Sequence, residues 1–236
     1  MTRLLYRDDA YLQRCETQVA SVDARGIRLE ATVFYAAAGG QPGDSGVLRL
    51  ADGATVAIVD AIPGEAPDEV IHVPAPGVGA PAVGTPVVAE IDWPRRYRHM
   101  RLHTCMHLLC AAVPYPVTGG QIAADRARLD FDTQGEALDK DRLSARLNEL
   151  VAGAHPVAPR WISEAELAAN PQLVRTMSVK PPAGQGRVRL LEIDGVDLQP
   201  CGGTHVRNTS EIGRVAVLKI ESKGRRNRRV VVGFVE

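Results

Sequence analysis

The sequence predicts an α+β protein, with a small N-terminal β-barrel over residues 1–92 and a two-layer α/β domain over residues 93–236. Three observations lead to this prediction. Short runs that favour strands, separated by Gly- and Pro-containing turns, fill the first part of the chain. A helical period of apolar residues begins after Asp92-Trp93-Pro94, and strand-like runs return towards the end. With 236 residues, 45% of them hydrophobic, the chain is long enough to bury two cores.

The strands of the predicted barrel are short and closely spaced. Candidate strands lie in residues 16–35, 46–50, 54–62, 70–74 and 85–93. The first run alternates apolar and polar residues around Arg25-Gly26, which predicts a hairpin. Asp52-Gly53 separates the second and third runs, and such a pair favours a tight turn. Residues 74–86 are so rich in Pro and Gly that we expect a long loop there.

A long helix opens the second domain. Apolar residues recur at helical spacing and define one face, formed by Leu102, Met106, Leu109 and Val113. Pro114 and Pro116 end the pattern, because proline cannot continue a helix.

The rest of the second domain mixes strands and helices. We expect a strand over residues 127–133 and helices over residues 137–152 and 164–170. Two further strand regions, residues 187–199 and 213–236, close on an Arg-rich turn. This arrangement gives the α+β class.

Composition and charge restrict the compartment and the partners. Lys and Arg together number 28 and so do Asp and Glu, so the net charge is zero and any nucleic-acid binding has to come from a local patch. The charged start is unlike a signal peptide, and no window of 18 apolar residues predicts a membrane span. Four scattered cysteines do not form a disulfide framework, so a reducing, cytoplasmic location is the simplest expectation.

Two short pairs of side chains resemble the ligands of one divalent metal ion. His103 and His107 lie four residues apart on the predicted helix and therefore on one face, and Cys201 and His205 flank a Gly-rich turn. Imidazole and thiolate together favour zinc, so we expect one Zn²⁺ per chain held by these four residues. The alternative for each pair is plain structure: hydrogen-bonded histidines on an amphipathic helix, and a cysteine in a tight turn. Whether such a zinc site is structural or catalytic stays open.

Four segments then occur in a fixed order along the chain. They are FYAAAGGQPGDSG at 34–46, HTCMHLL at 103–109, CGGTHV followed by RNTSEIG at 201–213, and IESKGRRNRR at 220–229. Together they resemble the editing domain of alanyl-tRNA synthetase and its free-standing relatives, the AlaX proteins, in their medium-length form. The resemblance covers nearly the whole chain. No aminoacylation domain accompanies it, so such a protein would act in trans, on tRNA charged elsewhere.

The resemblance implies a zinc-dependent aminoacyl-tRNA hydrolase, in which a barrel precedes a two-layer editing domain with a zinc site. Its substrate would be the acceptor end of tRNA(Ala) that carries a mischarged aminoacyl group, chiefly in seryl-tRNA(Ala) and secondarily in glycyl-tRNA(Ala). A synthetase site built for alanine discriminates weakly against glycine and serine, so a second, hydrolytic sieve is needed. By the same resemblance, His103, His107, Cys201 and His205 are the zinc ligands.

Residues of the pocket are predicted less directly. The resemblance implies a threonine hydroxyl that senses the side chain of serine, and Thr118 in PVTGGQI is the candidate, with Gln121 as a nearby polar contact; we treat both as catalytic-pocket residues. A plain turn before Gly119-Gly120 is the alternative. The resemblance also places Gly39, Gly40, Gln41 and Asp44 against the substrate, whereas a tight loop capped by Asp44 is the structural alternative.

Two basic clusters provide a local positive patch in this neutral chain. The run from Lys223 to Arg229 is the densest, and Arg225 and Arg226 are its candidate substrate-binding residues. Arg95, Arg96 and Arg98 precede the metal helix. Both clusters could hold RNA phosphates, although a solvated hairpin tip explains the first equally well.

Two other functions fit the same residues. A zinc-stabilised RNA-binding module without catalysis would also need the four ligands and the basic turn. A zinc hydrolase for a small ester or amide would need the ligands alone. No carboxylate in the sequence is an obvious general base.

Overall fold

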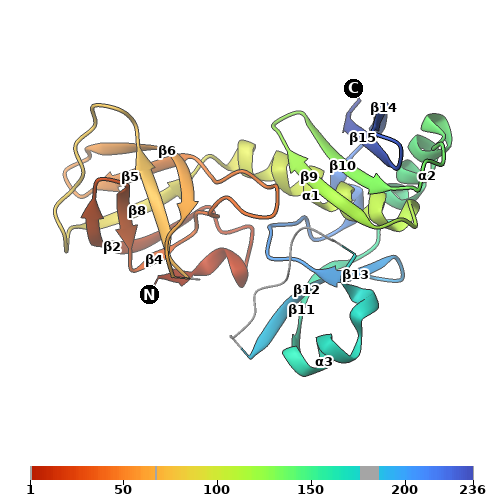
Figure 1. The fold of residues 1–236 in the computed structure, drawn as a ribbon. Helices are drawn as coiled ribbons and strands as arrows, with labels where there is room; N and C mark the ends of the chain where they lie inside the picture. The colour runs from red at the N-terminus through yellow and green to blue at the C-terminus, as the bar shows by residue number, and fades with distance from the viewer. Residues whose placement is uncertain (1, 67, 176–185, 236) are drawn as a thin grey trace. The chain divides into compact units, whose positions relative to one another are not determined.

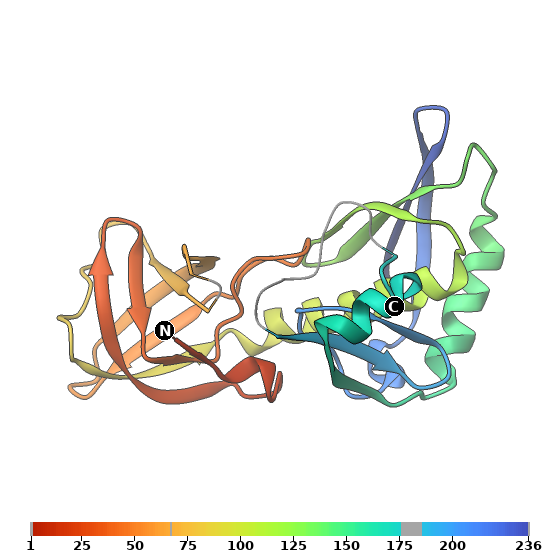
Figure 2. The same cartoon turned by 60° about the horizontal axis from the view of Figure 1, so that its bottom comes forward.

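The computed structural model describes residues 2–66, 68–175 and 186–235, and its contacts divide into two compact units, Met1–Arg98 and His99–Glu236. Figures 1 and 2 show a barrel in the first unit and a mixture of sheets and helices in the second. The boundary falls inside helix α1, Trp93–Ala112, which contributes residues to both units. The predicted α+β class, a barrel followed by an α/β part, is confirmed.

Six strands close the barrel in the order β2-β3-β7-β6-β5-β8. Their bounds are β2 Arg14–Asp23, β3 Gly26–Leu29, β5 Gly46–Leu50, β6 Thr55–Pro63, β7 Val70–Pro74 and β8 Pro86–Ile91. A short parallel pair, β1 Arg3–Leu4 with β4 Ala31–Thr32, and the 3₁₀ helix η1, Leu5–Arg7, complete the unit. Alternation directs one side of each strand inward, so that β6 buries Val56 and Ile58, and a register shift between Ile58 and Asp60 brings Ala61 inward in place of residue 60. The strands and the loop of residues 74–86 agree with the sequence prediction.

The hairpin of β2 and β3 requires glycine at the first residue of β3, Gly26. Gly26 has φ of +142°, and a Cβ there would lie 2.4 Å from the carbonyl oxygen of His72. Only glycine fits both conditions. Asp23 accepts the backbone N–H of Arg25 at 2.8 Å and so stabilises the two-residue turn.

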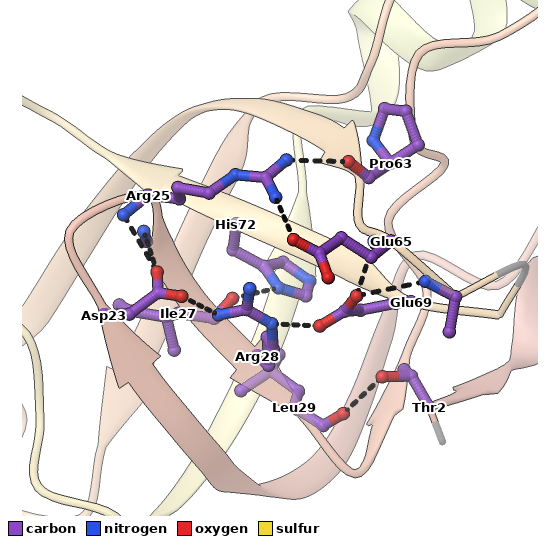
Figure 3. A network of polar contacts seen from close by, with 12 residues as sticks. Thr2, Asp23, Arg25, Ile27, Arg28, Leu29, Pro63, Glu65, Glu69 and His72 are labelled. Atoms are coloured by element: carbon purple, nitrogen blue, oxygen red, sulfur yellow. Dashed lines mark hydrogen bonds and ion pairs between the residues drawn. The ribbon is translucent and has the colours of Figure 1, made fainter.

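A polar network ties this hairpin to the neighbouring strands (Figure 3). Arg28 pairs with Glu69 and, at 2.8 Å, with Asp23. Beneath this network His72 is fully buried: its Nδ1 lies 3.0 Å from the carbonyl oxygen of Ile27 and its Nε2 lies 2.8 Å from Oγ1 of Thr32. Burial lowers the pKa of His72 to about 4, so this histidine is neutral near pH 7.

The second unit holds two sheets. One has the order β14-β15-β10-β9, and the other has the order β11-β12-β13. Their strands are β9 Val117–Ile122, β10 Arg126–Asp132, β11 Val157–Ser163, β12 Arg187–Ile193, β13 Asp197–Pro200, β14 Val215–Lys223 and β15 Asn227–Phe234. Helix α2, Lys140–Ala152, lies beside β14 (Figure 1), while α3, Glu164–Ala169, and the 3₁₀ helices η2, Pro171–Leu173, and η3, Thr209–Ile212, are short.

Local chemistry sets the ends of these helices. The carboxylate of Asp139 accepts the N–H groups of Asp141 and Arg142 at 2.9 Å, so α2 begins at Lys140, three residues later than its apolar pattern predicts. Ser163 and Glu166 form a capping box at the start of α3.

Three strands are not predicted from the sequence: β1, β9 and β11. β9 contains Gly119 and Gly120, and β11 contains Pro159; both residue types have low strand propensity. β11 is an edge strand, where a missing N–H is tolerated. The region 187–199 is a hairpin, because Gly195, at φ of +68°, turns the chain between β12 and β13. No helix among the described residues is long and apolar enough to span a membrane.

Candidate metal centre

Helix α1 and the loop after β13 bring four potential ligands to one point. His103 and His107 lie on successive turns of α1, and Cys201 and His205 come from the loop. The candidate ligand atoms of these four residues all lie within 4.8 Å of one another. The predicted convergence of the two sequence pairs is therefore present in the fold.

Two separations between ligand atoms are close to those of a tetrahedral zinc site. The Sγ of Cys201 lies 3.6 Å from Nε2 of His103 and 3.2 Å from Nε2 of His205. Zinc bonds of about 2.0–2.1 Å to nitrogen and about 2.3 Å to sulfur, arranged tetrahedrally, separate their donors by about 3.3–3.7 Å. Three imidazoles and one thiolate at this spacing could hold a metal ion.

A buried carboxylate orients His107. Its Nδ1 lies 3.0 Å from Oδ2 of Asp197, and the same oxygen accepts the side-chain amide of Gln199 at 2.7 Å. When Nδ1–H is donated to a carboxylate, Nε2 carries the free lone pair that a metal requires. Asp197 and Gln199 are both buried and alternate along β13, so both point to the same side as Cys201.

A threonine performs the same task for His205. The hydroxyl of Thr104 donates to the carbonyl oxygen of Met100 at 3.0 Å, so towards His205 it can only accept. Nδ1 of His205, 3.2 Å away, is then the N–H donor, and Nε2 is left facing Cys201. The sequence analysis identified neither Thr104 nor Asp197, although period-two spacing from Cys201 along a strand is a signal that could have found Asp197.

The ligand loop is fixed by an arginine. Nη1 of Arg189 donates to the carbonyl oxygens of Cys201 at 2.7 Å and Gly203 at 3.1 Å. The N–H of Gly203 points at Sγ of Cys201 from 3.5 Å, a contact that favours a thiolate. The loop is therefore held by contacts that leave the thiolate facing the histidines.

The close packing of these groups shifts the pKa values of three of them. Burial alone would raise the pKa of the Cys201 thiol, but the imidazoles of His103 and His205 bring that pKa well below its usual value. Burial, together with His103, lowers the pKa of His205 well below its usual value. For His107, burial lowers the pKa, whereas hydrogen bonds with Asp197 and Cys201 raise it, to about 9. Cys201 and His205 are thus shifted towards the deprotonated forms that bind a cation, whereas His107 must lose its proton to become a ligand.

The two predicted pocket residues lie on β9, next to the metal helix. A Cβ at Gly120 would lie 3.3 Å from Cε of Met106, a residue between the two helical ligands, so β9 packs against this part of α1. Half-buried Thr118 donates to the carbonyl oxygen of Asp130 at 3.2 Å. Gln121 is exposed and accepts from Arg128 at 3.2 Å. Their contact with a substrate stays a prediction.

The Gly-rich segment lies in the barrel unit. Gly39 and Gly40 form an exposed turn with positive φ values of 56° and 85°, and the neighbouring Gln41 is buried. Asp44 is 1% exposed and accepts the N–H of Tyr35 at 2.6 Å and the guanidinium of Arg96 at 3.0 Å. Within this unit the carboxylate of Asp44 thus stabilises the loop, as in the structural alternative; substrate contacts of the segment stay predictions.

The same contact corrects one part of the basic-cluster hypothesis. Arg96 is fully buried and also donates to the carbonyl oxygens of Ala10 at 3.0 Å and Val33 at 2.6 Å. Its guanidinium is used in contacts within the barrel unit, so Arg96 cannot belong to a phosphate-binding surface. The sequence could not show this, because the partners of Arg96 are distant along the chain.

The other basic cluster lies at the turn between β14 and β15, the long blue hairpin in Figure 2. Arg225 is exposed there. Arg226 pairs with Asp132 at 2.7 Å, but its side chain stays 66% exposed. Arg229, nearer the sheet, pairs with Asp130 at 2.7 Å. Positive charge therefore remains accessible at the tip, while the base of the hairpin is neutralised.

The fold and the site together define a class: two-unit α+β proteins with a His₃Cys cluster, able to hold a metal ion, between a helix and a Gly-rich loop. A family model described as the second additional domain of threonyl and alanyl tRNA synthetases matches residues 188–231. The alanyl-tRNA editing protein AlaX-M of Methanosarcina acetivorans is 35% identical over 98% of both chains, that of Methanosarcina barkeri is 36% identical over the full length of both, and that of Saccharolobus solfataricus is 34% identical over 98% of both. The chain belongs to the AlaX family of alanyl-tRNA editing proteins.

The same chain also matches part of a larger enzyme. It is 34% identical to the alanine–tRNA ligase of Metallosphaera sedula over 93% of its own length, which corresponds to 25% of the ligase. The predicted likeness to a part of alanyl-tRNA synthetase is thereby confirmed.

Proposed function

We propose that this protein is a trans-acting hydrolase that cleaves the aminoacyl ester of mischarged alanine tRNA, chiefly seryl-tRNA(Ala) and secondarily glycyl-tRNA(Ala). One observation carries the proposal: His103, His107, Cys201 and His205 converge within 4.8 Å in a chain that aligns over its full length with alanyl-tRNA editing proteins. Hydrolysis of the wrong product serves fidelity where binding differences between small side chains are too small.

The donor set supports Zn²⁺ as the resident ion, because one thiolate and three imidazoles suit this borderline-soft cation. When bound, it would supply Lewis-acid chemistry, either towards water or towards the amino group of the substrate. The chain's own contribution is to orient the donors. Asp197 holds His107, Thr104 holds His205, and Arg189 holds the loop of Cys201.

The side chain of the substrate would be read from β9. The Thr118 hydroxyl donates its proton to Asp130 and therefore keeps a lone pair for the hydroxyl of a seryl group. Alanine offers no such donor, so this contact would favour serine. Gln121 and the turn of Gly39, Gly40 and Gln41 are further candidates for polar contact with the aminoacyl end.

The acceptor end of tRNA(Ala) would be held through its phosphates. Arg225 and Arg226 at the exposed hairpin tip are suited to this, because phosphate contacts position RNA without reading its sequence. We expect the Arg225→Gln, Arg226→Gln double variant to raise KM and to flatten the dependence of KM on salt. Unchanged KM at several salt concentrations would remove these residues from the interface.

A second function is favoured by one specific observation. Four protein ligands can close a tetrahedral site, which is typical of structural zinc. The protein would then be a zinc-stabilised module that binds RNA without cleaving the ester.

Deacylation assays separate the two functions. Purified protein, with its metal content measured, is incubated with seryl-, glycyl- and alanyl-tRNA(Ala). The hydrolase releases serine fastest and leaves alanyl-tRNA(Ala) largely intact, and the His103→Ala, Cys201→Ala variant is inactive. Tight tRNA binding without release of any amino acid, from metal-loaded protein, would instead support the RNA-binding module.

A further inference from the structure

The three-stranded sheet of the second unit carries an exposed aromatic side chain. Trp161, on β11, is 40% exposed, and Cζ of Arg187, on β12, lies 4.4 Å from the centroid of its ring. The other tryptophan of the chain, Trp93, is used differently: it stacks on Tyr97 with ring centroids 5.4 Å apart. Trp161 and Arg187 are absent from every motif that predicted the metal centre.

The strand register places Trp161 in line with a metal ligand. Trp161 is paired with Arg189 across β11 and β12. On the next strand Cys201 donates its N–H to the carbonyl oxygen of Arg189 at 3.1 Å, which continues the register of β12 and β13 by one pair. Directly opposed residues of antiparallel strands point to the same face. The row Trp161, Arg189, Cys201 therefore shares one face, with Trp161 two strand spacings, about 10 Å, from Cys201.

One part of this face is covered and the other is accessible. Asp197 and Gln199 reach His107 of α1, so the helix covers the face beside the metal centre. Arg189 connects the two parts of the face. Its guanidinium donates to carbonyl oxygens of the Cys201 loop, and its partner on the neighbouring strand is Trp161. The exposed indole of Trp161 therefore lies next to the part of the face that helix α1 covers.

We propose that Trp161, with Arg187 beside it, is a stacking platform for a nucleobase in the single-stranded 3′ end of the tRNA. This inference rests on the proposed function, which requires that end to reach the metal centre. Single-stranded RNA is recognised by stacking on aromatic rings and guanidinium planes, and stacking tolerates any base. A base on the exposed indole would place its phosphate beside the positive charge of Arg187. The platform holds the end of the strand, and the four ligands lie within a short reach of it.

Fluorescence tests the contact directly. In a Trp93→Phe variant Trp161 is the single tryptophan, so its emission reports its own surroundings. The variant is titrated with an RNA hairpin that ends in single-stranded CCA and with the same hairpin ended blunt, while the anisotropy of a dye on the RNA reports binding. We expect quenching by the CCA-ended hairpin alone. Unchanged emission while the CCA-ended hairpin binds would overturn the platform.

Kinetics give a second readout. Trp161→Ala should raise KM for seryl-tRNA(Ala) about 5- to 150-fold, the range that loss of one stacked base represents. Metal content and kcat should stay within about twofold, and Trp161→Phe, which keeps a flat ring, should restore most of the affinity. Arg160→Ala is the matched control, because Arg160 is adjacent in sequence but points to the opposite face of β11.

The outcomes distinguish this inference from the proposed function. Normal KM in both Trp161→Ala and Arg187→Ala, with a wild-type protein that deacylates, overturns the platform alone. A wild-type protein that binds the hairpin and deacylates nothing overturns the proposed hydrolase, and the fluorescence titration then still decides whether Trp161 stacks on RNA. If Trp161→Ala fails to fold, Trp161→Phe and Arg187→Ala provide the kinetic test.

Discussion

Helix α1 carries two buried polar sites, and they differ in the kinds of groups that they bring together. Near its start, the Arg96 guanidinium meets the carboxylate of Asp44 and two carbonyl oxygens, so charge and hydrogen bonds are balanced by protein groups alone. Further along, His103 and His107 face Cys201 and His205, and the candidate ligand atoms of these four residues all lie within 4.8 Å of one another. Burial of such donors together is costly unless a cation lies between them.

The contrast distinguishes buried polar groups that stabilise the fold from buried polar groups that serve a function. A buried pair whose members satisfy each other supports the fold, whereas buried imidazole and thiolate groups that converge are suited to hold a metal ion. Histidines show the same distinction. His72 in the barrel is satisfied by Ile27 and Thr32, while His107 and His205 each use one ring nitrogen for a protein partner and keep the other for the candidate metal site.

The largest effect is expected from breaking the buried ion pair between Arg96 and Asp44. Asp44→Ala leaves the Arg96 guanidinium buried without its counter-charge, which should lower the free energy of unfolding by about 3–5 kcal/mol. Urea unfolding of the two proteins measures the difference. The control is Glu90→Ala, which removes the partner of Arg49 from a pair whose side chains are 36% and 51% exposed; it should cost less than about 1 kcal/mol. Equal costs for the two variants would contradict the structural role of Asp44.

A somewhat smaller effect is expected from protonation of His72. Its pKa is about 4 in the folded protein and about 6.5 when unfolded, so between these values the unfolded chain binds more protons. The contribution is fully present above pH 6.5 and is lost as the pH falls towards 4. Between pH 7 and pH 5 it should lower the free energy of unfolding by about 2 kcal/mol.

Carboxylates also titrate in this range, so the control is His72→Gln measured at the same two pH values. The variant lacks the imidazole, and its loss of stability between pH 7 and pH 5 should be smaller than that of the wild type by about 2 kcal/mol. An identical loss in both proteins would show that His72 titrates normally in the folded state.

Sequence patterns could predict whatever depends on spacing within one segment. Alternation and turn pairs predict the barrel strands, and the four-residue spacings predict His103, His107, Cys201 and His205. Strands β9 and β11 are not predicted for a local reason: Gly119, Gly120 and Pro159 lower strand propensity, and only tertiary pairing compensates for it.

Residues that act across strands could not be predicted in this way. Arg96 pairs with Asp44, which is 52 positions away in the sequence, and Thr104 contacts His205, which is 101 positions away. Such pairs depend on the register and packing of distant segments, which a single sequence does not display. Trp161 is the clearest case, because its relation to Cys201 exists only through the register of three strands.

An effect of similar size is expected when the four candidate metal ligands lose part of their support. Asp197→Ala removes the acceptor of the His107 N–H, so the imidazole loses its fixed orientation, and zinc affinity should fall about 10- to 100-fold. Competition with a chromophoric chelator measures the affinity without reference to activity. Asp197→Asn keeps a carbonyl oxygen that can accept from Nδ1–H and should recover part of the loss. Asp194→Ala, at the exposed turn of the same hairpin, is the matched control and should bind zinc as the wild type does. If Asp197→Ala binds zinc as tightly as Asp194→Ala, the ring of His107 is held by packing alone, and the carboxylate has no part in preparing the site for its ion.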